Sequence, residues 1–164
     1  MKANLELVKR TNHLYTVPYM VDEKGNTWCF GNDATVNWPN VDMQFRNNKE
    51  YPIKIECITR NGIITFNIWG TWDGYTAEYR YVEKDREKYK HVYRRYKEGK
   101  KNQAGQLGRT IWTYRVIFYQ EEPDVGERKE VERYREFIST YRPLNEVKYV
   151  NSPPAGKEFD VAYD

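Results

Sequence analysis

The strongest constraint on the fold is a β-hairpin signal centred on Asn61-Gly62. Residues 52–57 before it and residues 64–68 after it alternate between apolar and polar side chains. An Asn-Gly pair between two alternating runs favours a type I′ turn, in which both central residues take positive φ. The sequence therefore predicts two antiparallel strands joined at residues 61–62.

Three further segments have strand patterns. Residues 75–82 place Tyr75, Ala77, Tyr79 and Tyr81 on one face, residues 110–119 are rich in β-branched and aromatic side chains, and residues 145–150 read as a final strand. Aromatic residues make up 16% of the chain, and such side chains suit pleated, half-buried surfaces. We expect a β-rich fold, all-β or α+β, built as a mostly antiparallel sheet or a small barrel.

Two segments fit more than one element. Tyr89, Val92, Tyr93 and Tyr96 recur at helical spacing within a highly charged stretch, which suggests one helix near residues 84–97. The same residues also alternate locally as in a strand. Residues 129–139 fit a helix or a strand equally well.

The length of 164 residues corresponds to about one domain, or to one domain with a small added module. We expect a first β region over residues 1–82 and a second β module over residues 83–151 packed on the first. Residues 152–164 contain Pro and Gly near their start and are expected to form an extended tail.

The charges are nearly balanced and interspersed. The chain has 27 basic and 24 acidic residues and a net charge of +3, which argues against a dedicated nucleic-acid binder. No long apolar run occurs, so neither a signal peptide nor a membrane span is expected, and the compartment stays open.

Cys29 and Cys57 allow one disulfide or none. Because Cys57 lies in a strand pattern, we expect it to be a buried thiol.

Residues 32–53 contain Asp33-Ala-Thr-Val, followed by an Asp42-Met-Gln-Phe-Arg-Asn run and an apolar strand. This order resembles the VanW family, and the upstream Leu5-Glu-Leu-Val-Lys-Arg-Thr-Asn-His segment is similar to a second family pattern. The resemblance covers about residues 5–70. It implies a protein of the bacterial cell envelope, in some cases from a glycopeptide-resistance cluster. The family also has a Gly-rich G-x-C-Q type segment, and neither Cys29 nor Cys57 sits in one.

Residues 114–147 are weakly similar to the G-five β-module. The strand–turn–strand order and the Ile-Ser-Thr tail carry this similarity, which extends over about residues 100–150. The module often follows VanW in secreted proteins and is proposed to bind cell-wall sugars, so the resemblance implies a sugar-binding role.

The VanW resemblance singles out five candidate binding residues, namely His13, Asp33, Thr35, Asp42 and Arg46. A histidine titrates near neutral pH and can act in hydrogen bonding or acid–base chemistry, or it can simply tie a loop to the sheet. Asp42 and Arg46 suggest a buried ion pair. The turn that contains Asp33 and Thr35 could instead line a groove.

A second candidate site is the Gly-containing segment with Trp69, Trp72, Asp73 and Tyr75. Exposed aromatic faces stack on sugar rings, and a carboxylate holds sugar hydroxyls, although such rings can equally belong to a core. A zinc site from His13, Cys29, Cys57 and His91 lacks the usual ligand spacing. We expect no cofactor, no metal and no catalytic constellation.

These observations favour a non-catalytic binding or scaffold module of the cell envelope whose ligand is peptidoglycan or another wall glycan. One alternative is the C-terminal fragment of a VanW-type enzyme, with its Gly-Cys half upstream or on a partner chain. Another alternative is a structural or assembly protein.

Overall fold

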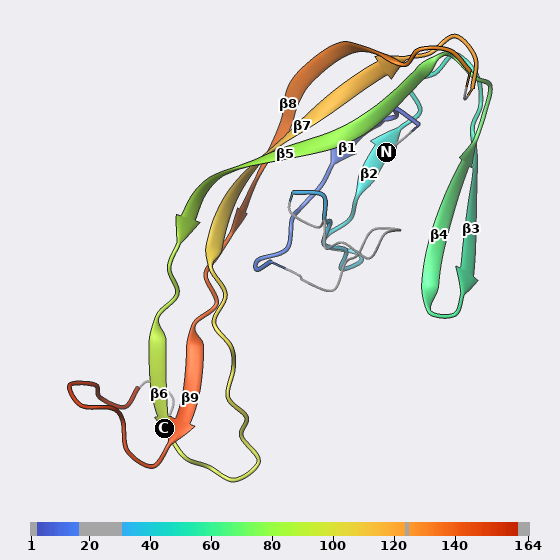
Figure 1. Ribbon diagram of the computed structural model, residues 1–164. Helices are drawn as coiled ribbons and strands as arrows, with labels where there is room; N and C mark the ends of the chain where they lie inside the picture. Colours follow the sequence, from blue (N-terminus) through green and yellow to red (C-terminus); the bar gives the residue numbers. More distant parts are fainter. Residues whose placement is uncertain (1–2, 17–30, 124, 161–164) are drawn as a thin grey trace. The chain divides into compact units, whose positions relative to one another are not determined.

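The regular secondary structure of the chain is β-strand throughout the part that the computed structural model describes, residues 3–16, 31–123 and 125–160 (Figure 1). The strands are β1 (Glu6–Lys9), β2 (Gln44–Arg46), β3 (Lys54–Arg60), β4 (Ile63–Trp69), β5 (Tyr75–Glu87), β6 (His91–Arg95), β7 (Gly108–Tyr119), β8 (Lys129–Tyr141) and β9 (Glu146–Val150). Within these ranges, no helix has the length and apolarity needed to cross a membrane.

The strands form four small sheets. β1 pairs with β2 and β3 with β4, both antiparallel, while β6 pairs with β9 in parallel. The fourth sheet has the order β5-β7-β8, and its strands alternate in direction (Figure 1). The prediction of a β-rich fold with mostly antiparallel sheets is confirmed.

The hairpin predicted at Asn61-Gly62 is confirmed. Asn61 has φ of 52° and Gly62 has φ of 75°, as a type I′ turn requires. The ladder runs from Lys54 opposite Trp69 to Arg60 opposite Ile63. Local turn chemistry and side-chain alternation together specify this element.

The helix expected near residues 84–97 is wrong. β5 continues through the charged stretch to Glu87, and β6 then runs from His91 to Arg95. All five residues of β6 are paired with β9. The spacing of apolar residues within 84–97 does not indicate this pairing. Aromatic and β-branched side chains such as Tyr93 and Val92 fit that paired strand, so tertiary pairing overrides the local pattern.

β7 is the most buried strand, because it lies between β5 and β8 in its sheet. The ambiguous segment 129–139 belongs to β8, the neighbour of β7. The buried apolar side chains are Leu5, Ala77, Ile111, Val116, Ile117, Phe118, Tyr141 and Val147. β7 supplies four of these, so the core gathers around it.

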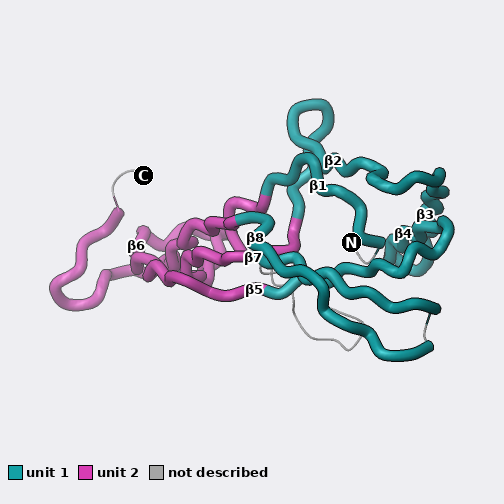
Figure 2. Tube along the Cα trace, turned by 90° about the horizontal axis from the view of Figure 1, so that it is seen from above, with its two compact units in different colours: residues 1–11, 34–80, 113–137 teal, residues 12–33, 81–112, 138–164 magenta. Residues whose placement is uncertain are grey.

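The chain divides into two compact units, coloured separately in Figure 2. Unit 1 contains residues 1–11, 34–80 and 113–137, and unit 2 contains residues 12–33, 81–112 and 138–164. Each unit therefore draws on three separate stretches of sequence. The division into 1–82, 83–151 and 152–164 stays a prediction.

Unit 1 contains a buried cation on β7. The guanidinium of Arg115, whose side chain is only 2% exposed, lies 2.6 Å from a carboxylate oxygen of Glu136 on β8. It also donates to the carbonyl oxygen of Leu5 at 2.7 Å and to the hydroxyl of Tyr79 at 3.0 Å. Burial raises the pKa of Tyr79 to about 12, although the Arg115 charge opposes this. Tyr79 therefore stays a neutral hydrogen-bond partner.

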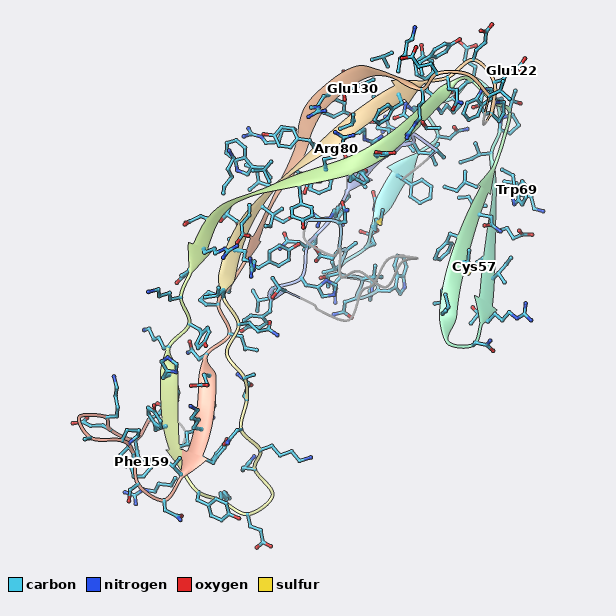
Figure 3. The ribbon with its side chains drawn as sticks, in the orientation of Figure 1. Cys57, Trp69, Arg80, Glu122, Glu130 and Phe159 are labelled. Carbon is cyan, nitrogen blue, oxygen red and sulfur yellow. The ribbon has the colours of Figure 1, made fainter. Side chains whose placement is uncertain are left out.

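The Glu136→Gln variant should lose about 3–5 kcal/mol of unfolding free energy, because it leaves the Arg115 charge buried without its anionic partner. Urea denaturation followed by tryptophan fluorescence measures the loss. Glu130→Gln is the matched control on the same strand, because Glu130, labelled in Figure 3, pairs with Arg133 at the surface. That variant should leave the midpoint nearly unchanged. Equal midpoints for the two variants would contradict a stabilising role of the buried pair.

Candidate functional site

Two residues from the VanW resemblance meet in unit 2. The carboxylate of Asp33 is fully buried, and its Oδ2 accepts from the backbone N–H of His13 at 2.6 Å. The same oxygen lies 2.9 Å from His13 Nδ1. The other oxygen, Oδ1, accepts a short hydrogen bond from the hydroxyl of Tyr141. Asp33 and His13 thus form a defined carboxylate–imidazole pair.

Hydrogen bonds from neighbouring residues hold this pair against the end of β8. The side chain of Asn12 donates to the carbonyl oxygen of Thr140 at 3.0 Å, and Arg142 N–H donates to the carbonyl of Leu14 at 2.8 Å. Gly31 N–H donates to the Tyr141 hydroxyl at 2.8 Å. Tyr141 could not be found from the sequence, because no spacing pattern links a tyrosine 108 residues away to Asp33.

The His13–Asp33 arrangement is suited to orienting an imidazole. A carboxylate on Nδ1 fixes the tautomer and leaves Nε2 as the nitrogen for further chemistry. The His13 side chain is 27% exposed. Over the described part of the chain, no group of three His, Cys, Asp or Glu side chains gathers as metal ligands. Cys29, one residue of the disfavoured zinc alternative, lies outside the described residues.

The predicted ion pair between Asp42 and Arg46 is wrong. The β1–β2 register places Arg46 opposite Glu6, and these side chains pair at 3.4 Å at the surface. Asp42 pairs with Lys9 at 2.7 Å. The hydrogen bond from Lys9 lowers the pKa of Asp42. Asp42 and Arg46 thus each pair with a residue of β1 and not with each other, which a sequence separation of four does not reveal.

Thr35 belongs to unit 1, whereas His13 and Asp33 belong to unit 2. Its backbone N–H donates to the carbonyl oxygen of Thr11 at 2.7 Å, and its side chain is half-buried. The Asp33-Ala-Thr-Val signature therefore spreads over both units.

The aromatic segment 69–75 contributes to two different hollows of unit 1. Asp73 and Tyr75 line a polar pocket of about 420 Å³, together with Asn4, Asn48, Lys49, Glu50, Tyr51, Ile117, Val131 and Glu132. Tyr75 is 43% exposed and Trp72 is 37% exposed, and the indole N–H of Trp72 donates to the carbonyl of Glu121 at 3.0 Å. The rings of Trp72 and Tyr75 are thus exposed, and Tyr75 lies beside the amide and charged groups that line the pocket.

Asp73 is the electrostatic centre of this polar pocket. The ammonium of Lys49, which is almost fully buried, lies 2.6 Å from Asp73 Oδ2. Burial raises the pKa of Asp73, but hydrogen bonds from Lys49 and from Tyr75 N–H outweigh it, so the pKa is lowered overall. Burial and the Asp73 charge raise the pKa of Tyr51. The pocket therefore offers an ionised carboxylate and a neutral phenol at neutral pH.

Trp69 faces the second hollow, an apolar groove of about 810 Å³. Its lining residues are Ala3, Val36, Met43, Phe45, Ile55, Phe66, Asn67, Ile68 and Trp69. Cys57 and Trp69 are both labelled on the β3–β4 hairpin in Figure 3. Cys57 is exposed, so the expectation of a buried thiol is wrong. Other apolar side chains of the hairpin are largely solvent-accessible too, among them Ile55, Ile64 and Phe66.

The fold defines the chain as an all-β protein with mostly antiparallel sheets. Residues 1–69 match the VanW family model, described as VanW like protein, so this part of the chain is a VanW-like region. That match confirms the resemblance found in the sequence over about residues 5–70. No curated protein and no solved structure matches the chain. The G-five-like similarity at residues 100–150 stays a prediction.

The Asp33→Ala variant should lose about 3 kcal/mol of unfolding free energy, because three buried or half-buried donors lose their acceptor at once. Thermal or urea unfolding measures this loss. Asp42→Ala removes the other signature aspartate, which contacts Lys9 and Gln44 at the surface, and should leave stability close to that of the wild type. If the two variants were equally stable, the buried network would not be a structural determinant.

Proposed function

We propose that the chain is a non-catalytic binding or scaffold module of the cell envelope that recognises peptidoglycan or another wall glycan. The VanW-like region over residues 1–69 supports the proposed location in the cell envelope. The observation that carries the ligand class is the polar pocket that Asp73 and Tyr75 line. The weak G-five similarity at residues 100–150 points to the same class of ligand.

The pocket has the composition that a sugar requires. Tyr75 lines it and its ring is accessible for stacking on the apolar face of a pyranose. Asn4, Asn48 and Glu132 supply amide and carboxylate groups for hydroxyl and acetamido substituents. A pocket of about 420 Å³ lies within the range of small-molecule sites, which is roughly 300–1,000 Å³. One or two sugar rings are of this size.

The Lys49–Asp73 pair gives the pocket a fixed polar base. Because Lys49 is 8% exposed and held by Asp73, it is already neutralised and does not favour a free anion. Ligand selection would then come from stacking and from neutral hydrogen bonds. A neutral glycan fits this pattern better than a phosphate-rich polymer does.

Titration with soluble muropeptides, followed by ¹⁵N-resolved NMR, should shift the resonances of Asn48, Asp73 and Tyr75. Tyr75→Ala should weaken binding about tenfold, equivalent to about 1.4 kcal/mol, because the stacking face is lost. Tyr96→Ala, at an exposed tyrosine that does not line the pocket, should bind as the wild type does. If no shifts appeared at the pocket, or if both variants bound equally well, the glycan proposal would be wrong.

A second candidate is favoured by the His13–Asp33 pair. In this reading the chain is the C-terminal part of a VanW-type enzyme, and the Gly-Cys motif lies upstream or on a partner chain. The carboxylate-oriented imidazole of His13 would then take the proton of that cysteine thiol. His13 and Asp33 would both serve the reaction, the latter by positioning the ring.

This candidate is tested by co-expressing the chain with the polypeptide encoded directly upstream and measuring iodoacetamide labelling of its cysteine against pH. His13→Ala should move the labelling midpoint to higher pH, because the thiolate loses its imidazolium partner. A conservative His13→Gln variant should behave like His13→Ala. The absence of a G-x-C-Q segment in the upstream coding sequence, or an unchanged midpoint, would exclude the candidate.

A further inference from the structure

Residues 88–101 form a strongly basic segment of unit 2. The segment contains seven Lys and Arg residues and a single acidic residue, Glu98, whereas the net charge of the whole chain is only +3. Positive charge is therefore concentrated here. Four of the basic residues follow each other closely at the carboxyl end of β6 and are exposed to solvent. We call these four the basic turn, namely Arg95, Lys97, Lys100 and Lys101.

A β-turn brings the three lysines of the basic turn together. The backbone N–H of Lys100 donates to the carbonyl oxygen of Lys97 at 3.1 Å, and Gly99 between them has φ of 78°. The first and last Cα atoms of a β-turn lie within about 7 Å of each other. Lys101 follows directly in the sequence. Three ammonium groups are thus attached to neighbouring positions of the backbone.

Carboxylates neutralise lysines elsewhere in the chain but not in the basic turn. The ammonium groups of Lys9 and Lys49, for example, lie 2.7 and 2.6 Å from carboxylate oxygens. Over residues 3–16, 31–123 and 125–160, no carboxylate forms an ion pair with any of the three lysines of the turn. Arg95 lies over the ring of Phe159, labelled in Figure 3, at 4.8 Å, and this contact leaves its charge uncompensated. The basic turn therefore presents unneutralised positive charge.

The basic turn is fixed to β9 on both sides. Before it, the backbone N–H of Tyr96 donates to the carbonyl oxygen of Val150 at 3.0 Å. After it, Gln103 donates to and accepts from the backbone of Val147, both at 2.9 Å. Residues 97–101 are thus a short loop between two anchors on one strand. Because the backbone is already held, an anion that binds there loses little affinity to the ordering of the loop.

We propose that the basic turn binds a linear polymer of phosphate esters. Each lysine ammonium is a compact point charge that suits phosphate oxygens, and a polymer with one charge per repeat can contact several such groups at once. Single-stranded nucleic acids are held by bases stacked on successive aromatic rings. Lipid surfaces are bound by basic residues next to several apolar side chains that enter the membrane. Within residues 88–103, Tyr96 is the one large apolar side chain that is strongly exposed, so neither arrangement is present.

This site does not depend on the glycan proposal. The residues that line the polar pocket belong to unit 1, whereas the basic turn belongs to unit 2. The two sites also differ in chemistry, since the ammonium of Lys49 in the pocket is neutralised by Asp73. A cell-envelope protein with both sites would hold an uncharged glycan in one unit and a phosphate polymer in the other.

Fluorescence anisotropy with end-labelled poly(glycerol phosphate) tests the proposal. Four contacts predict a slope of about −3 for log affinity against log salt, because each contact to a single strand contributes roughly −0.7 between about 50 and 200 mM salt. The triple variant Lys97→Gln/Lys100→Gln/Lys101→Gln should reduce the slope to about −1 and weaken binding at least tenfold at about 50 mM salt. In the wild type, the polymer should shift the NMR resonances of Gly99 and Lys100.

The matched control is Lys9→Gln/Lys54→Gln/Lys129→Gln, which removes the same net charge from unit 1 and should bind the polymer as the wild type does. A dispersed NMR spectrum shows that each variant is folded, and muropeptide titration of both variants reports on the glycan pocket separately. Failure of the wild type to bind the polymer at low salt would overturn the proposal. So would equal weakening by the two triple variants, or tighter binding to an oligodeoxythymidylate of equal charge or to phosphatidylglycerol vesicles.

Discussion

The buried guanidinium of Arg115 is the constraint on which the rest of unit 1 depends. An arginine cannot lose its proton in a protein, so its charge must be met wherever the side chain is buried. Its partners come from three separate parts of the chain: the Leu5 carbonyl just before β1, Tyr79 on β5 and Glu136 on β8. Because β7 lies in the centre of its sheet, this one side chain ties the start of the chain to both flanking strands.

The signature residues of the VanW-like region separate into two physical roles. Asp33 and His13 belong to a buried hydrogen-bond network that ends on Tyr141, whereas Asp42 and Arg46 form surface pairs with residues of β1. Surface ion pairs contribute little to stability, while a buried carboxylate with three donors contributes much more. A sequence motif can therefore combine residues with very different energetic weight.

Much of the strand content follows from local sequence. The Asn61-Gly62 turn and the alternation on each side determine the β3–β4 hairpin, and the β-branched run at residues 110–119 determines most of β7. The strands within residues 84–97 could not be predicted in this way, because β6 forms by pairing with β9. In that pairing His91 lies opposite Glu146, which is 55 residues further along the chain. Periodicity describes one segment at a time and has no information about such distant pairing.

The candidate sites also combine residues that local sequence indicates with residues that only the fold brings close. Tyr75 and Asp73 could be chosen from sequence, because glycines mark a turn and rings beside a carboxylate suggest sugar chemistry. Their partners Lys49 and Tyr51 come close only in the folded chain, and Tyr141, the last residue of β8, contacts Asp33. The exposure of the hairpin was also unpredictable, since alternation indicates an apolar face and does not say what covers it.

The hydrogen bond from Arg115 to the Leu5 carbonyl joins the part of the chain that matches the family model to a strand outside it. The family match ends at residue 69, whereas Arg115, which donates to the Leu5 carbonyl, lies on β7. The stretch that matches the family model therefore lacks a side chain that holds its own first residues in place. A fragment restricted to residues 1–69 would leave the Leu5 carbonyl without the Arg115 guanidinium that donates to it.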